Sequence, residues 1–199
     1  MTPSVVVFDI GAVLVDWQPA LAWADELGLD GAQAFMDRVR FDKINFACDG
    51  GATFGAAADL IDDPEDAALL AQYVSRYTRT VPDKITGTWD LLYALKEQGV
   101  PTHAITNWSF ETWPEGLKVH PELGEVFGTT IVSGQVGMLK PSVEIYRLLC
   151  TRAGVAPETC VFIDDGLHNC LGARAAGMDA IHFTGPDALA EALKTRGLL

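Results

Sequence analysis

The chain has 199 residues, of which 49% are hydrophobic and 21% are charged, a profile typical of a globular protein and unlike that of a disordered or fibrous chain. Its formal net charge of −13 would repel nucleic acid phosphates and anionic lipid surfaces, so we expect neither as a main partner. An anionic substrate would therefore need a local positive group or a metal ion to attract it.

Five short apolar runs rich in β-branched residues predict buried parallel strands. They lie at Val5–Phe8, 102–105, Thr130–Val132, 161–163 and 180–183. Between them, amphipathic patterns predict helices at Thr86–Glu97, 142–153 and 168–176. Strands that alternate with helices predict an α/β fold with a doubly wound, Rossmann-like parallel sheet.

Residues 17–81 do not continue this alternation of strands and helices. They contain amphipathic stretches such as 32–39 and 65–77 but no convincing strand. We predict that they form a small α-helical cap domain inserted after the first strand, and that residues 1–16 and 82–199 form the α/β core. The glycines between positions 49 and 55 follow no strand, which argues against a dinucleotide-binding loop, and we expect Thr53 to begin a helix there.

Six polar side chains follow the predicted strands or precede a predicted helix, at the edge where open α/β sheets bind ligands. They are Asp9, Thr106, Asn107, Lys140, Asp164 and Asp165. A carboxylate can attack phosphorus and form an acyl-phosphate, and grouped carboxylates need a cation, for which oxygen ligands favour Mg²⁺. A metal ion and a lysine would then stabilise the charge of the transferring phosphoryl group.

Four separated stretches carry these residues. They read Val-Val-Val-Phe-Asp9-Ile-Gly11, Ala-Ile-Thr106-Asn107, Gly-Met-Leu-Lys140-Pro141 and Val-Phe-Ile-Asp164-Asp165-Gly-Leu-His-Asn169. In this order, over nearly the whole chain, they resemble the four motifs of the haloacid dehalogenase (HAD) superfamily of hydrolases, in the subgroup with a helical cap after the first motif.

The resemblance implies roles for the acidic residues. Asp9 would be the nucleophile and a magnesium ligand, and Gly11 would bind the same ion through its backbone carbonyl. Asp165 would be a further carboxylate ligand, and Asp164 would help directly or through water.

The resemblance also implies how a substrate is held. Thr106 and Asn107 would bind the phosphate, and Lys140 would hold both the nucleophile and the phosphate. Asn169 would orient the metal-binding loop.

One position departs from the family pattern. Phosphatases of this family usually carry a second aspartate two residues after the nucleophile, which transfers a proton, and Gly11 cannot do so. A bacterial sugar-phosphate phosphatase branch resembles this chain in the same Asp-x-Gly motif and in the stretch Trp113-Pro114-Glu115. The leading prediction is therefore a magnesium-dependent hydrolase of small phosphomonoesters, including sugar phosphates.

Two other functions stay open. A 2-haloacid dehalogenase would use the same aspartate on carbon, but it needs neither magnesium nor the pair Asp164 and Asp165. A binding or regulatory protein could have kept the site and lost turnover through Gly11. A phospho-receiver domain is excluded by order, because there the acidic pair comes early and the lysine last. The oligomeric state stays open as well.

The cysteines and the N-terminus favour a cytoplasmic protein. The four cysteines form no Cys-x-x-Cys pair and no clustered histidines accompany them, so we interpret them as buried reduced thiols rather than zinc ligands. The N-terminal residues show no basic region followed by a long apolar stretch, and we therefore expect neither a signal peptide nor a membrane span.

Overall fold

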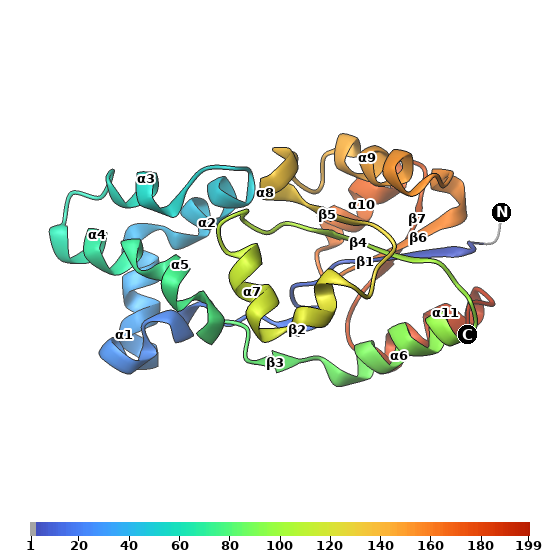
Figure 1. Cartoon of the computed structure of the whole chain (residues 1–199), viewed down its shortest axis with the longest axis horizontal. Helices are drawn as coiled ribbons and strands as arrows, with labels where there is room; N and C mark the ends of the chain where they lie inside the picture. The colour runs from blue at the N-terminus through green and yellow to red at the C-terminus, as the bar shows by residue number, and fades with distance from the viewer. Residues whose placement is uncertain (1–2) are drawn as a thin grey trace.

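A five-stranded parallel sheet forms the centre of the protein in the computed structural model, which describes residues 3–199 (Figure 1). The strand order is β5-β4-β1-β6-β7, so the first strand lies in the middle. The strands are β1 (Val5–Phe8), β4 (Thr102–Thr106), β5 (Thr130–Val132), β6 (Cys160–Asp164) and β7 (Asp179–His182). The predicted α/β fold with a parallel sheet is confirmed, and strand bounds differ from the predicted ones by a single residue at most.

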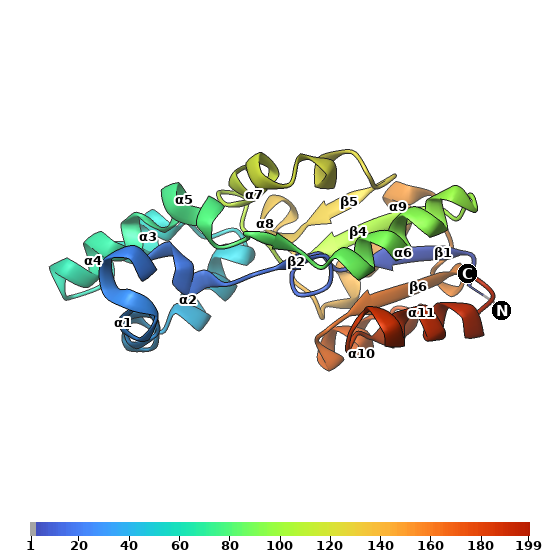
Figure 2. The same cartoon turned by 90° about the horizontal axis from the view of Figure 1, so that it is seen from below.

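Helices cover both faces of the sheet, as expected for a doubly wound fold (Figures 1 and 2). Helices α6 (Thr86–Glu97) and α11 (Pro186–Thr195) lie on one face, and α9 (Val143–Ala153) and α10 (Leu167–Ala175) lie on the other. Because side chains alternate along a strand, Val6 and Phe8 of β1 belong to the cluster that contains Leu92 and Leu189. Val5 and Val7 belong to the opposite cluster, with Ile145 and Cys170.

Residues 19–79, here named the helical insertion, extend beyond one end of the sheet (Figure 1). Their elements are η1 (Pro19–Ala22), α1 (Ala24–Val39), α2 (Phe41–Asp49), α3 (Phe54–Ala58), α4 (Pro64–Ala71), α5 (Tyr73–Arg76) and η2 (Tyr77–Arg79). Thr53 begins α3 as predicted, because its hydroxyl accepts the Ala56 N–H at 3.2 Å. The chain enters and leaves the insertion through a short antiparallel pair, β2 (Val15–Asp16) and β3 (Asp83–Lys84).

Aromatic rings form the interior of the helical insertion. The Trp23 ring lies 4.8 Å from Phe35 and 5.2 Å from Tyr73, centroid to centroid, and Trp23 is fully buried. Such rings bury large apolar areas. The contacts continue from Tyr73 to Tyr77 at 5.7 Å, and from Tyr77 to Trp108 in the loop after β4 at 5.6 Å. The insertion is therefore packed against the α/β core through a continuous aromatic path.

The elements that the sequence pattern did not predict are mostly short. The strands β2 and β3 have two residues each, too few to show an alternating pattern. Helices α7 (Trp113–Val119) and α8 (Ser133–Val136) have seven and four residues. Helix α11, with ten residues, was also missed, although Leu189 and Leu193 are spaced for one buried face.

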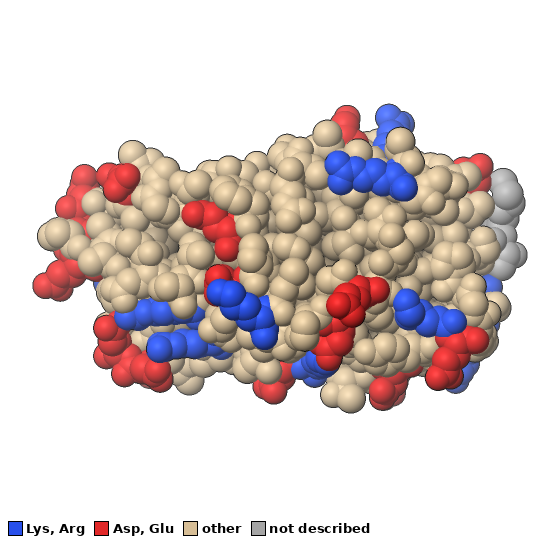
Figure 3. Space-filling view, viewed as in Figure 1, with Lys and Arg blue, Asp and Glu red and all other residues tan. Residues whose placement is uncertain are grey.

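The charged surface, the helix lengths and the cysteines can be compared with the expectations from composition. On the face of the described residues that Figure 3 shows, lysines and arginines stand among aspartates and glutamates instead of forming one basic surface. Within residues 3–199, we find no helix with the length and apolar character needed to cross a bilayer. All four cysteines are buried and free, as predicted.

The close contact between α10 and the Lys140–Pro141 segment gives a testable prediction. A Cβ atom added at Gly172 would lie 2.3 Å from the Pro141 carbonyl oxygen, so one of the two backbones must move. We expect Gly172→Ala to lower the free energy of unfolding by about 1–3 kcal/mol, measured by urea denaturation. The matched control is Gly55→Ala in α3, where a Cβ meets nothing within 4 Å and no loss is expected. Equal stability of the two variants would contradict the prediction.

Candidate active site

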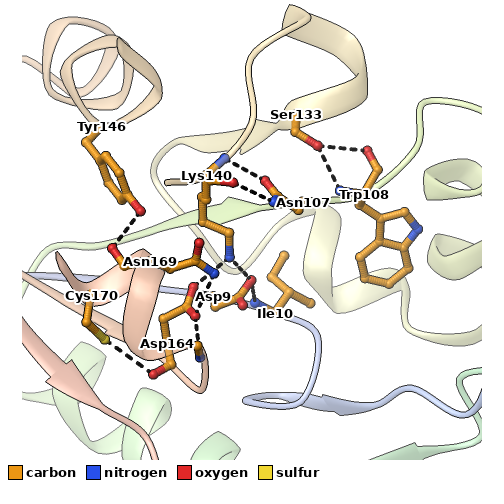
Figure 4. A network of polar contacts seen from close by, with 11 residues as sticks. Asp9, Ile10, Asn107, Trp108, Ser133, Lys140, Tyr146, Asp164, Asn169 and Cys170 are labelled. Atoms are coloured by element: carbon orange, nitrogen blue, oxygen red, sulfur yellow. Dashed lines mark hydrogen bonds and ion pairs between the residues drawn. The ribbon is translucent and has the colours of Figure 1, made fainter. Parts of the chain in front are cut away.

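Lys140 lies between two aspartates at the carboxyl end of the sheet (Figure 4). Its Nζ is 2.7 Å from Asp9 Oδ1 and 2.7 Å from Asp164 Oδ2. Asp9 follows β1 and Asp164 ends β6, and these strands are neighbours in the sheet. Only 2% of Lys140 is exposed, so the ammonium group has exchanged its water for the two carboxylates.

Three carboxyl groups gather at this point. Asp9, Asp164 and Asp165 each offer an oxygen, and these oxygens lie within 4.8 Å of one another. With the ammonium of Lys140, three carboxylates carry a net charge of −2. Two of the aspartates are buried and Asp165 is exposed, so the group is open to solvent on one side. An all-oxygen donor set with this charge fits a hard divalent cation.

Burial and the neighbouring charges shift the pKa values of these groups. Burial raises the pKa of Asp9 well above its usual range and the charge of Asp164 adds to this, whereas Lys140 and the Ile10 N–H oppose it. Burial alone would lower the pKa of Lys140, but the charges of Asp9 and Asp164 outweigh it and raise that pKa. The lysine therefore stays protonated, and it favours the ionised form of Asp9 that a nucleophile needs.

The loop after β6 is held by the second oxygen of Asp164. Asp164 Oδ1 accepts the Gly166 N–H at 2.8 Å and the Asn169 Nδ2–H at 2.9 Å. The Tyr146 hydroxyl in turn donates to the Asn169 carbonyl at 2.8 Å. Asn169 thus contacts the acidic residue of this loop, and its orienting role stays a prediction. Since both Asp164 oxygens already accept hydrogen bonds, Asp165 is the acidic residue of this loop that is free to face a cation.

The two residues predicted to bind phosphate lie at the same edge of the sheet. Thr106 is the last residue of β4 and is buried. The Asn107 side chain exchanges two hydrogen bonds with the Lys140 backbone, from Nδ2 to the carbonyl at 3.1 Å and from the Lys140 N–H to Oδ1 at 2.9 Å. Asn107 therefore positions Lys140, a contact that sequence reasoning missed because the two residues are 33 positions apart.

A cavity of about 70 Å³ lies between the α/β core and the helical insertion, and it is lined by Gly11, two residues after Asp9, and by Asn107. The core contributes Gly11, Asn107 and Trp108 to its lining. Helix α2 contributes Asn45 and Asp49, and Trp17 comes from the segment between β2 and the helical insertion. Asn45 and Asp49 are one helical turn apart on α2, so they share one face. Their spacing is visible in the sequence, but nothing there shows that this face of α2 meets the core.

The buried Lys140 gives a prediction about stability in metal-free buffer. Lys140→Met would leave two buried carboxyl groups unpaired, which should cost about 3–5 kcal/mol. Without the ammonium, the pKa of Asp9 in the folded state rises further above its unfolded value. The loss of unfolding free energy should therefore be largest near about pH 8, where the Asp9 carboxyl group must ionise. It should be smaller near about pH 5, where that group can hold a proton.

Urea denaturation in EDTA at both pH values measures this difference. The control is Lys194→Met, which removes an exposed ion pair with Glu191 at 2.8 Å and should cost at most about 1 kcal/mol. A Lys140→Met penalty that is independent of pH, or no larger than the control's, would contradict the prediction.

Curated relatives match this chain over most of its length or over about half of it. Fructose-1-phosphate phosphatase YqaB of Escherichia coli K12 is 26% identical over 182 residues, covering 88% of this chain and 94% of that protein. The sesquiterpene phosphatase astK of Aspergillus oryzae is 32% identical over 109 residues, and the match spans 55% of this chain and about half, 54%, of that protein.

Solved structures share the fold. A HAD family enzyme of Bacteroides thetaiotaomicron in complex with magnesium and inorganic phosphate has a TM-score of 0.66 at 20% identity, covering 92% of this chain and 95% of that chain. A dehalogenase with an intermediate complex has a TM-score of 0.70 at 20% identity, covering 98% and 97%. Because a dehalogenase and an enzyme that binds magnesium and phosphate share this fold, the fold alone does not distinguish a dehalogenase from a phosphatase. The sequence model for haloacid dehalogenase-like hydrolases matches residues 4–177, and the chain therefore belongs to the haloacid dehalogenase-like hydrolases.

Proposed function

We propose that the protein is a magnesium-dependent phosphatase that hydrolyses small phosphomonoesters through an aspartyl-phosphate on Asp9. The observation that carries this proposal is the group formed by Asp9, Asp164, Asp165 and Lys140, in which three carboxyl oxygens lie within 4.8 Å of one another. A phosphate dianion could not approach such a group without added positive charge. A divalent cation supplies that charge, and the structures of the family include one with magnesium and phosphate.

The residues of the site have different roles in the proposed reaction. A carboxylate oxygen of Asp9 forms the bond to phosphorus while the bond from phosphorus to the ester oxygen breaks. Lys140, 2.7 Å from Asp9 Oδ1, favours the ionised form of that carboxylate and holds it in place. We propose that Thr106 and Asn107 contact the phosphate, since both lie at the same sheet edge. Water then hydrolyses the acyl-phosphate and restores Asp9.

Asp9, Asp165 and the Gly11 carbonyl would hold the magnesium ion, and Asp164 and Asn169 would fix the loop that carries Asp165. When bound, the ion neutralises charge on the phosphoryl oxygens. The donor chemistry supports this choice, because hard oxygen ligands and a net charge of −2 suit a hard divalent cation.

We propose that residues 17–81, the predicted cap domain that contains the helical insertion, select the substrate. The support is the cavity of about 70 Å³, whose lining includes Trp17, Asn45 and Asp49 together with Asn107 of the core. Aromatic and polar side chains of this kind suit a small hydroxylated leaving group. The similarity to a fructose-1-phosphate phosphatase supports sugar phosphates. Buried free cysteines support a cytoplasmic location.

The dehalogenase alternative is disfavoured by the acidic loop. Displacement of halide from carbon needs no metal, and it would give no reason for Asp165 to complete a group of three carboxyl groups. A 2-haloacid assay with halide detection separates the two reactions directly.

The nucleophile is tested by Asp9→Asn. In the presence of Mg²⁺, the wild type should release phosphate from small phosphomonoesters, and EDTA should abolish the release. Because an amide is a poor nucleophile, Asp9→Asn should lower kcat by about 10⁴-fold or more. Acid-quenched wild type should carry a phosphoryl group on the peptide that contains Asp9, detectable by mass spectrometry, and the variant should not.

The control for this test is Asp16→Asn, which changes an exposed aspartate on β2 that accepts a hydrogen bond from Gln18. It should leave phosphate release unchanged. Full activity of Asp9→Asn would overturn the assignment of the nucleophile. Halide release without phosphate release would favour the dehalogenase, and binding of phosphate without turnover would favour the catalytically impaired protein.

Metal binding should stabilise the fold. At a Mg²⁺ concentration of 100 times the Kd, the free energy of unfolding should rise by about 2.7 kcal/mol, measured as an increase in Tm. Asp165→Asn removes an exposed carboxylate and should abolish most of this increase while leaving the metal-free Tm unchanged. The control Asp59→Asn changes an exposed residue of the helical insertion and should keep the full increase. An undiminished increase in Asp165→Asn would exclude Asp165 as a ligand.

A further inference from the structure

Departure of an alcohol from phosphorus raises a chemical problem at this site. An alkoxide is a poor leaving group unless it receives a proton, and the attacking water must later lose one. Gly11, which lines the cavity, has no side chain that could carry a proton. Lys140 is held between Asp9 and Asp164, so its protons serve those two carboxylates. Another titratable group must therefore reach the cavity.

Asp49 is such a group. It is the last residue of α2, it lines the same cavity as Gly11 and Asn107, and it is 8% exposed. The Ser133 hydroxyl ties its backbone to the core, because it donates to the Asp49 carbonyl at 2.6 Å and accepts the Trp108 N–H at 2.9 Å. Asp49 is thus fixed against the loop that follows β4, although it comes from the helical insertion.

The carboxyl group of Asp49 accepts a hydrogen bond from a neutral side chain. Asn45 Nδ2 donates to Asp49 Oδ2 at 2.9 Å. Burial raises the pKa of Asp49 to about 7, and contact with the Ser109 backbone, the charge of Lys140 and the Asn45 amide oppose this rise only in part. A carboxyl group with such a pKa holds a proton and releases it near neutral pH.

The titratable side chains around Asp49 come from several elements. Four of them interact electrostatically with Asp49 when they are charged. They are Cys48 on α2, Tyr73 on α5, Tyr77 on η2 and Lys140 in the segment before α9. Burial raises the pKa of Cys48 to about 12 and that of Tyr77 well above its usual range, so these groups are neutral near pH 7. Lys140 is the charged member of this set.

We propose that Asp49 is the general acid and base of the reaction, a role that rests on the phosphatase function proposed above. As the bond between phosphorus and the ester oxygen breaks, the Asp49 carboxyl group donates its proton to that oxygen, and the alcohol leaves neutral. The Asp49 carboxylate then accepts a proton from the water that attacks the aspartyl-phosphate. One turnover therefore returns Asp49 to its protonated form, and no further reactant is needed.

Two other roles for Asp49 make different predictions. If Asp49 only bound a substrate hydroxyl, its loss would raise KM and leave kcat unchanged for esters of polyols. If it only fixed the loop at Ser109, its loss would impair all substrates alike. The leaving group separates proton transfer from both, because p-nitrophenolate departs as a stable anion and an alkoxide does not.

The experiment compares glycerol 1-phosphate with p-nitrophenyl phosphate, both with Mg²⁺, for the wild type and Asp49→Asn. We expect Asp49→Asn to lower kcat for glycerol 1-phosphate by about 10²–10⁴-fold, the usual effect of a lost general acid. The phosphorylation of Asp9 by p-nitrophenyl phosphate, followed as the first-turnover burst of p-nitrophenolate, should change far less. The control is Asp42→Asn, a change on the same helix at a side chain that is 71% exposed, which should behave as wild type.

Equal losses with both esters, a change in KM alone, or no change at all would each overturn the role of Asp49. If the wild type releases phosphate from neither ester, the proposed function fails instead, and the two failures are thereby distinguished. If Asp49→Asn does not fold, the pH dependence of the wild-type rates tests the role of Asp49. Its rate ratio of glycerol ester to nitrophenyl ester should fall as the pH rises through about 7, because Asp49 loses its proton there. A ratio that is independent of pH would contradict the proposal.

Discussion

The site depends on one buried ammonium group between two carboxylates. Lys140, Asp9 and Asp164 are brought together from three distant parts of the chain, and each of the two ion pairs is 2.7 Å long. Without that positive charge the two buried carboxylates would repel one another and take up protons. The central position of β1 beside β6 is what places the acids so close. The fold and the chemistry therefore share a single electrostatic requirement.

Much of this arrangement could be predicted from local patterns. The strand Val5–Phe8 and the helix Thr86–Glu97 were predicted with their observed bounds, because buried apolar runs and amphipathic spacing are properties of neighbouring residues. The convergence of Asp9 and Asp164 followed from the rule that parallel strands end at one edge. The contacts of Asn107 with the Lys140 backbone and of Ser133 with Asp49 could not be predicted, because they join residues 33 and 84 positions apart and leave no local pattern.

The helical insertion is connected to the core by packing as well as by the chain. Its aromatic interior runs from Trp23 through Tyr73 and Tyr77 to Trp108, which directly follows Asn107. Trp108 also lines the cavity with Trp17. The same ring thus contributes to the stability of the insertion and to the wall that a substrate would meet. Sequence changes within the insertion can therefore alter the cavity without touching the carboxylates.

The middle position of β1 has a consequence for how the protein is made. Among the five strands of the sheet, β1 is translated before the others, yet its two hydrogen-bonded neighbours, β4 and β6, are synthesised later. At 5–20 residues per second, about 8–30 seconds separate the translation of β1 from that of β6. Throughout that interval the nascent apolar segment Val5–Phe8 has no partner on its β6 side. The first strand of the sheet to be translated is thus among the last to be enclosed, and until β6 is made its open edge could pair with another chain.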